Sequence, residues 1–296
     1  LFRKSRRLDV EGWRSPVPPF SANVPVGGTG GTMSGPHAYN AVVAKTLEDW
    51  LGPEGQGRYR EALGPIRFWS SDEEGRWKAA GSPLPPPFNP EYRQLYGGAF
   101  EDANEASSHV IDMDHRGWGN FNFPDTSKLP TEPQALRRQV ENNEIEVEGF
   151  NLMFPKERHL DAEQTAEELI NCLREAPPTP ALQAAFFDAL AELPNIRLDT
   201  DAADGLGRPG SAIVLRPKEG VRTEYLFNPE TGASLAQRTM LVDPAAVHPG
   251  LQGIPAGTVI AESDVIATAI VDSTQETGQG AEQETSGAAA APVYQR

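Results

Sequence analysis

The segment from residue 178 to residue 244 constrains the fold most strongly, because a helical apolar pattern there runs directly into closely spaced strand patterns. Apolar residues recur at three- and four-residue intervals over 180–193, which predicts an amphipathic helix. Thr179 is a favoured N-cap, and Pro180 suits the first helical position, where its missing N–H costs nothing. Pro194 ends the pattern, so the helix boundaries follow from local chemistry alone.

Four short strand patterns follow this helix, and each alternates apolar with polar residues or is apolar throughout. They lie near 196–199, 213–215, 222–227 and 235–241. The segment 228–232 reads Asn-Pro-Glu-Thr-Gly, in which Pro presets one φ and Gly accepts a positive one, as in a tight turn. Connections this short permit antiparallel pairing but no parallel crossover, so the segment predicts an antiparallel β-meander.

A second helix is expected before the first one. Asp161 and Gln164 have the spacing of a capping box, and an apolar stripe from Ala166 to Leu173 follows them. Prolines at 177 and 178 separate the two helices, which predicts a helical hairpin. The expected fold class is therefore α+β, with a curved antiparallel meander packed on a helical hairpin.

One set of apolar residues joins the helix to the strands. We interpret these residues as core, and the alternative is that they line a cavity for an apolar ligand. They are Leu182, Phe186, Leu190, Tyr225 and Phe227.

A third helix is expected from Thr131, because Thr131 and Gln134 have capping-box spacing and Leu136 and Val140 fall on one face. The single cysteine, Cys172, lies within the second helical pattern. It excludes an internal disulfide and a cysteine-based zinc site, and a small buried hydrophobe is its favoured role.

The first third of the chain is expected to be irregular. The segment 1–36 combines a basic start with Pro- and Gly-rich stretches, which predicts an extended arm without a core. The spacing of apolar residues over 37–51 predicts a helix. Two short apolar runs, 66–70 and 76–80, flank Asp-Glu-Glu-Gly and predict a β-hairpin, and 109–112 predicts a further short strand.

These patterns divide the chain into four parts: an arm (1–36), an N-terminal α+β portion (37–128), the helical hairpin with its sheet (129–272) and a tail (273–296). The tail is rich in Gln, Glu, Gly, Thr and Ala, so it buries too little apolar surface to offset its ordering entropy, and we expect it to be disordered. A net charge of −16 over 296 residues argues against a nucleic-acid or anionic-membrane surface.

Sequence motifs for catalysis are weak. Residues 205–210 match G-x-G-x-x-G formally, but they lie between two strand patterns and contain Pro209, so we expect a hairpin loop and no dinucleotide site. Asp112, Asp114 and His115 form the best local cluster for an acid–base pair or a metal. The other histidines have no ligand spacing, and no nucleophile elbow occurs. We therefore expect no enzyme and no cofactor.

Several motifs between residues 129 and 261 occur in an order that resembles a known family. They are LPTEPQAL (129–136), the helix to Leu193, PNIR (194–197), GRPG (207–210), YLFNPETG (225–232) and IPAGTV (254–259). Their order and spacing resemble an uncharacterised actinobacterial family of membrane-anchored proteins, whose genes commonly neighbour those of extracytoplasmic-function sigma factors. The resemblance implies an extracytoplasmic domain, attached to the membrane by an N-terminal span that is not in this sequence. It implies no catalytic residues.

The leading functional hypothesis is thus a non-enzymatic extracytoplasmic domain that binds a protein partner or an apolar ligand, as the sensing half of a sigma-factor-linked envelope signalling system. By fold analogy, the expected sheet and helices are similar to those of lipoprotein carriers and sigma-regulator domains. One alternative is a hydrolase or metal-dependent enzyme that uses Asp112, Asp114 and His115. Another is a structural component of a surface assembly.

Overall fold

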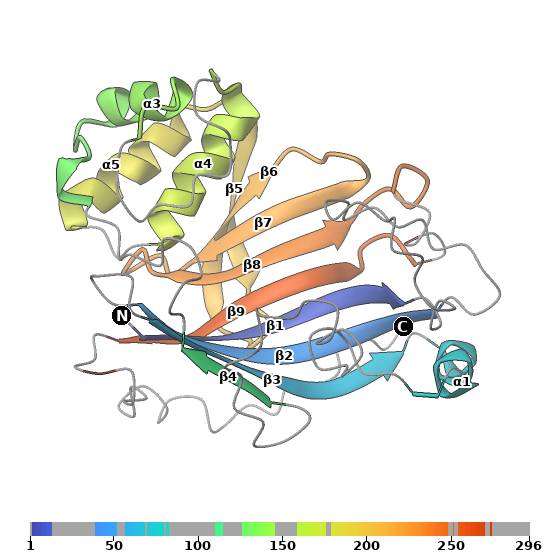
Figure 1. The fold of residues 1–296 in the computed structure, drawn as a ribbon. Helices are drawn as coiled ribbons and strands as arrows, with labels where there is room; N and C mark the ends of the chain where they lie inside the picture. The colour runs from blue at the N-terminus through green and yellow to red at the C-terminus, as the bar shows by residue number, and fades with distance from the viewer. Residues whose placement is uncertain are drawn as a thin grey trace, which may run out of the picture.

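In the computed structural model of the protein, nine strands of the described residues form one antiparallel sheet, in the order β4-β3-β2-β1-β9-β8-β7-β6-β5 (Figure 1). The strands are β1 (Phe2–Trp13), β2 (Tyr39–Leu51), β3 (Gly57–Phe68), β4 (Val110–Asp114), β5 (Ile196–Ala203), β6 (Pro209–Leu215), β7 (Val221–Phe227), β8 (Ser234–Leu241) and β9 (Val259–Ala269). The structure describes residues 2–13, 39–51, 57–68, 70–79, 81–82, 110–114, 126–145, 159–175, 179–247, 251, 254–269 and 273.

The consecutive strands β5 to β8 lie side by side as the predicted meander, and β9 pairs next to β8. Ile213 faces Tyr225 across β6 and β7, and Tyr225 faces Gln237 across β7 and β8, so one face of the sheet carries all three residues. The turn between β7 and β8 has the expected chemistry: the side chain of Asn228 accepts two backbone N–H groups, and Gly232 has a φ of +68°. The α+β class is confirmed.

The strand β1 occupies the middle of the sheet, between β2 and β9. The sequence predicts an extended arm without a core of its own for this stretch. It is extended, but it pairs on both sides, and long-range pairing of this kind leaves no local signal in the sequence. Residues 14–36 of the predicted arm lie outside the described residues.

The prediction of a helix over 37–51 is wrong, because 39–51 forms β2. As an inner strand, β2 buries residues on both faces, including the adjacent Val42 and Val43 as well as Trp50. A strand buried on both faces loses the strict alternation that would identify it, so its apolar residues fit a helical spacing by coincidence.

The predicted hairpin over 66–80 is also wrong. The first run ends β3, and the second lies in helix α1 (Ser71–Ala79). The Ser70 hydroxyl accepts the N–H of Glu73, acidic residues fill the first turn, and Lys78 forms an ion pair with Glu74 at i,i+4 spacing. Each of these features favours a helix at this site.

Three helices gather at one end of the sheet (Figure 1). They are α3 (Pro133–Glu141), α4 (Ala162–Glu175) and α5 (Pro180–Ala191), and a short 3-10 turn (Thr126–Lys128) precedes them. Helix α5 is capped by Thr179, and the capping box of Asp161 and Gln164 begins α4, both as predicted. The cap of α3 differs by one residue: Glu132, not Thr131, accepts the backbone N–H groups of the first turn.

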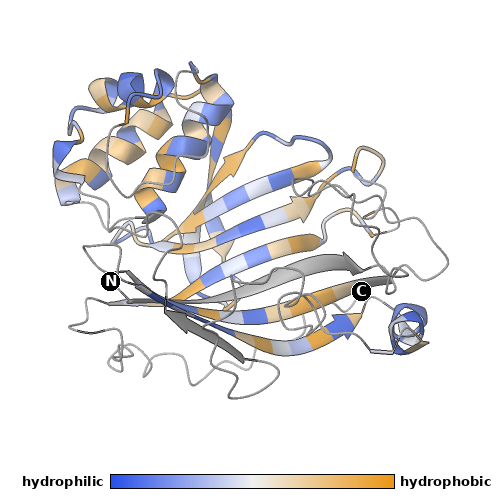
Figure 2. Ribbon diagram, viewed as in Figure 1, coloured by the Kyte–Doolittle hydropathy of each residue, from blue (hydrophilic) through white to orange (hydrophobic). Residues whose placement is uncertain are grey.

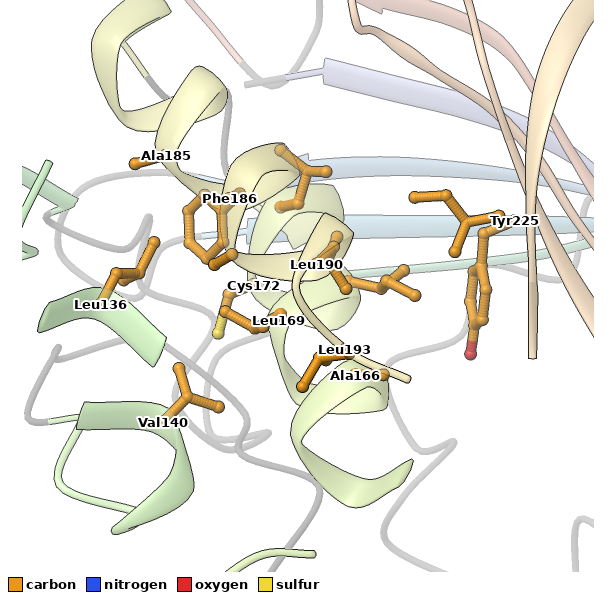
Figure 3. Packing of buried hydrophobic residues seen from close by; sticks show 14 of the residues in the cluster. Leu136, Val140, Ala166, Leu169, Cys172, Ala185, Phe186, Leu190, Leu193 and Tyr225 are labelled. Atoms are coloured by element: carbon orange, nitrogen blue, oxygen red, sulfur yellow. The ribbon is translucent and has the colours of Figure 1, made fainter. Parts of the chain in front are cut away.

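The main core lies where α3, α4 and α5 meet each other and the strands β6 and β7 (Figure 3). Its strand members are Ile213, Leu215, Tyr225 and Phe227. Cys172 is buried within this core, which confirms the role predicted for it. The helical hairpin therefore packs on the meander as expected.

The sheet continues across the sequence boundary predicted near residue 128, because β1 to β4 and β5 to β9 belong to the same sheet. The predicted strand at 109–112 is confirmed as β4. Within the predicted disordered tail, only Ser273 is among the described residues.

Candidate binding face beside helix α4

The five apolar residues predicted to form a core or cavity lining come together in one cluster. Their exposed fractions lie between 0 and 6%: they are Leu182, Phe186, Leu190, Tyr225 and Phe227. The ring of Phe187 meets that of Phe227 edge-on, with 5.3 Å between the ring centroids. These contacts place the five side chains in the hydrophobic core, and Tyr225 lies on the side of the cluster that faces the strands (Figure 3).

Tyr225 marks the border between this core and the rest of the sheet face. The guanidinium of Arg174, from helix α4, stands over the Tyr225 ring at 5.6 Å from its centroid. The same guanidinium donates a hydrogen bond of 2.6 Å to Oε1 of Gln237, the residue opposite Tyr225 on β8. One helical side chain thus joins two neighbouring strands.

The electrostatic environment at this border is mixed. Burial raises the pKa of the Tyr225 hydroxyl, while the Arg174 cation opposes that shift and Glu167 adds to it. Burial also raises the pKa of the Glu167 carboxyl, and the Lys218 ammonium opposes this second shift. Helix α4 therefore presents a fixed cation and a titratable carboxyl beside the sheet.

Beyond Tyr225, the same sheet face carries small or polar side chains. Strand register places them together across β7, β8 and β9, and each is half-buried. They are Thr223, Gln237, Thr239, Ala261 and Ser263. We call this set, with Arg174 and Tyr225, the binding face. Hydrophilic residues lie in the middle of β7 and β8, with hydrophobic residues towards the strand ends (Figure 2).

The opposite face of the sheet holds ion pairs that are largely buried. Glu224, on β7, lies 2.6 Å from Arg222 and 3.4 Å from Arg238, and Arg238 also donates to the carbonyl of Ala203. Glu48, on β2, pairs with Arg60 on β3 at 2.8 Å. These carboxylates have cationic partners on neighbouring strands, so their arrangement stabilises strand register.

The formal G-x-G-x-x-G motif is a hairpin loop between β5 and β6, as predicted. Asp204 accepts the backbone N–H groups of Leu206 and Arg208. The Arg208 side chain then donates to the Asp204 carboxylate at 2.6 Å and to the backbone carbonyls of Leu235 and Val265 at 3.2 and 2.7 Å. The loop is therefore attached to β8 and β9.

The candidate catalytic cluster falls at one edge of the sheet. Asp112 and Asp114, on β4, stand opposite Arg60 and Arg58 of β3, and His115 lies outside the described residues. Register thus places both acidic residues beside arginines. In the part of the chain that the structure describes, no group of three His, Cys, Asp or Glu residues has the geometry to hold a metal ion.

Sequence reasoning identified the apolar cluster but missed the binding face. The alternation of Thr223 and Tyr225 predicted a common face for these two residues, and that signal was available. The contact of Arg174 with Gln237 joins residues far apart in the chain, so no local pattern predicts it.

Comparison of the chain with protein-family models, with curated proteins and with solved structures found no match. The family resemblance therefore stays a prediction. No described helix combines the length and the apolar composition needed to cross a membrane.

Proposed function

We propose that this chain is a non-enzymatic binding domain whose binding face receives a protein partner. The observation that carries the proposal is the position of Arg174, whose guanidinium contacts the Tyr225 ring and donates a hydrogen bond to Gln237. Half-buried small side chains lie next to these residues. Rigidly held aromatic and arginine side chains are the groups that most often dominate binding energy in protein interfaces.

The chemistry of the face suits a partner that makes hydrogen bonds. Thr223, Thr239 and Ser263 supply hydroxyls that both donate and accept. The half-buried side chains extend over β7, β8 and β9, which suits contact with a polypeptide, whereas a small metabolite requires an enclosed pocket. An extracytoplasmic location, attachment to a membrane and a role in sigma-factor-linked signalling belong to the proposal through the family resemblance alone.

An apolar ligand is the second candidate. Its support is the position of Tyr225, whose ring belongs to the apolar cluster while its strand neighbours lie on the binding face. Such a ligand enters by displacing part of the apolar cluster beside Tyr225. Native mass spectrometry of the purified protein, followed by lipid extraction, tests this version: a co-purifying apolar adduct supports it, and an adduct-free mass speaks against it.

Binding of a protein partner is tested by placing a positive charge on the binding face. In Thr239→Lys a long cation stands on β8, while Glu230→Lys places one in the β7–β8 turn, where residue 230 is exposed. We expect wild-type protein and Glu230→Lys to retain the same envelope protein after cross-linking. Retention by Thr239→Lys should fall about tenfold.

Equal retention by both lysine variants, with unchanged circular dichroism spectra, contradicts the proposed face. The enzyme alternative has a separate test. Hydrolytic activity that is lost in Asp112→Asn and Asp114→Asn supports it, because these substitutions remove the carboxylates and keep the side-chain shape.

A further inference from the structure

The strand β5 forms one edge of the sheet and pairs only with β6 among the described residues. Its residue Leu198 is 64% exposed and is the single large hydrophobic residue with that degree of exposure among the residues whose burial the structure describes. An exposed strand edge offers unpaired backbone N–H and C=O groups to another strand. The apolar residue at its centre favours such pairing.

The residues on either side of Leu198 have opposite charges. Arg197 and Asp199 lie on the same face of β5, and their closest charged atoms are 3.9 Å apart. Their side chains are 62% and 43% exposed, so the contact within the chain is a weak one in water. Both groups remain available to a partner.

We propose that two copies of the protein pair through β5, antiparallel and with Leu198 opposite Leu198 of the partner subunit. The two-fold axis then places Arg197 opposite the partner's Asp199 and Asp199 opposite the partner's Arg197. The segment around Leu198 is therefore self-complementary, as a two-fold interface requires. The two leucine side chains lie on the same face of the joined sheet and cover each other.

The charges also select this register over its neighbours. A shift that centres the axis on Asp199 brings two carboxylates face to face, and a shift that centres it on Arg197 does the same with two guanidinium groups. Like charges directly opposite each other destabilise a strand pair. Only pairing centred on Leu198 gives two attractive contacts and buries the exposed leucine.

The interface is short. The ladder between β5 and β6 is irregular between Asp199 and Ala202, so the regular part of the edge ends just beyond Leu198. Such a contact buries less than the roughly 1,200 Å² of a standard interface, and we expect a weak dimer that depends on protein concentration.

Charge reversal tests the pairing. Sedimentation velocity between about 5 and 500 µM should show a monomer–dimer equilibrium for the wild type. Arg197→Asp and Asp199→Arg should each weaken dimerisation at least about tenfold, because each brings like charges together. The control Glu230→Arg, in the exposed β7–β8 turn, should dimerise as the wild type does.

Mixing the two single variants gives the decisive result. In a heterodimer of Arg197→Asp with Asp199→Arg, both cross-strand contacts are attractive again, so the mixture should associate although each variant alone remains monomeric. A general loss of stability in either variant does not produce this recovery. A wild type that stays monomeric over the whole range, or a mixture that stays monomeric, overturns the proposal.

Cysteine cross-linking checks the register independently. Leu198→Cys should form an intermolecular disulfide on mild oxidation, since the Cα atoms of directly opposite residues lie about 4.5–5.5 Å apart, within the roughly 4.4–6.8 Å that a disulfide spans. Thr200→Cys should not, because the proposed register separates the two substituted residues by several positions along the strands. The native Cys172 is 1% exposed and does not compete. Equal cross-linking of both variants contradicts the register.

Discussion

One guanidinium attaches the β5–β6 loop to the centre of the sheet. The side chain of Arg208 reaches the buried Asp204 carboxylate and two carbonyls on β8 and β9. The side chain of Asp204 is fully buried, so loss of its cation leaves a carboxylate that only backbone N–H groups solvate.

We predict that Arg208→Ala lowers the free energy of unfolding by about 2–3 kcal/mol. Arg208→Lys should recover only part of this loss, because an ammonium cannot reproduce the planar fork that meets three acceptors. Urea denaturation measures both values. The exposed Arg216, which follows β6, provides the control: Arg216→Ala should change stability by less than about 0.5 kcal/mol.

A second prediction at this scale concerns Glu167, whose pKa is raised by burial. A carboxyl with a raised pKa in the folded state favours folding when protonated and opposes it when ionised. Its contribution is present at low pH and is lost as pH rises through the folded-state pKa. Glu167→Gln should therefore raise the melting temperature at pH 7 and have little effect near pH 4.

Differential scanning calorimetry at both pH values checks the sign of this effect. Glu230→Gln is the control, because it also removes one negative charge but lies in the exposed β7–β8 turn. If Glu167→Gln stabilises the protein equally at the two pH values, the effect comes from packing and not from titration.

Among the elements, those with local signals could be predicted from the sequence. Helix α5 begins at Thr179 and Pro180 because an N-cap and a fixed φ act within one turn. Even there, α3 begins one residue later than expected, because Glu132 reaches two N–H groups that a shorter Thr131 was expected to satisfy. Capping residues predict the first residue of a helix to within about one position, because their hydrogen bonds stay within the first turn.

The pairing of strands was predictable only where turns lie close together. The meander from β5 to β8 follows from short connections, whereas β1 and β2 depend on partners distant in sequence. Val42 and Val43 are both buried because β2 is covered on both faces. Burial on both faces depends on the packing around the sheet, so the local sequence does not predict it.

The candidate site likewise has a part that local sequence patterns predict and a part that they do not. Leu182, Phe186 and Leu190 follow from helical periodicity. The position of Arg174 over Tyr225 depends on how α4 crosses the sheet, and the crossing is decided by packing throughout the core.

At the scale of the whole molecule, β1 connects the two parts of the sheet, since β2–β4 lie on one side of it and β5–β9 on the other. Leu8 stands opposite Ala44 on β2 and opposite Glu262 on β9. Proline at this position removes a backbone donor from a strand that is paired on both sides, so one hydrogen bond of the ladder is lost.

We predict that Leu8→Pro lowers amide protection along both β2 and β9, while helices α3 to α5 keep theirs. Hydrogen exchange with mass spectrometry measures protection in each segment. Leu8→Val, which keeps the N–H and favours a strand, is the matched control and should leave protection unchanged. Loss of protection confined to β1 itself contradicts a connecting role for this strand.

The pairing of Ser5 with Val265 also has a consequence for biosynthesis. At roughly 5–20 residues per second, translation from the first of these residues to the second takes tens of seconds. During that time the edge of β1 that later meets β9 has no native neighbour. Until the last strand emerges, the unpaired backbone groups along that edge can pair with a strand other than β9.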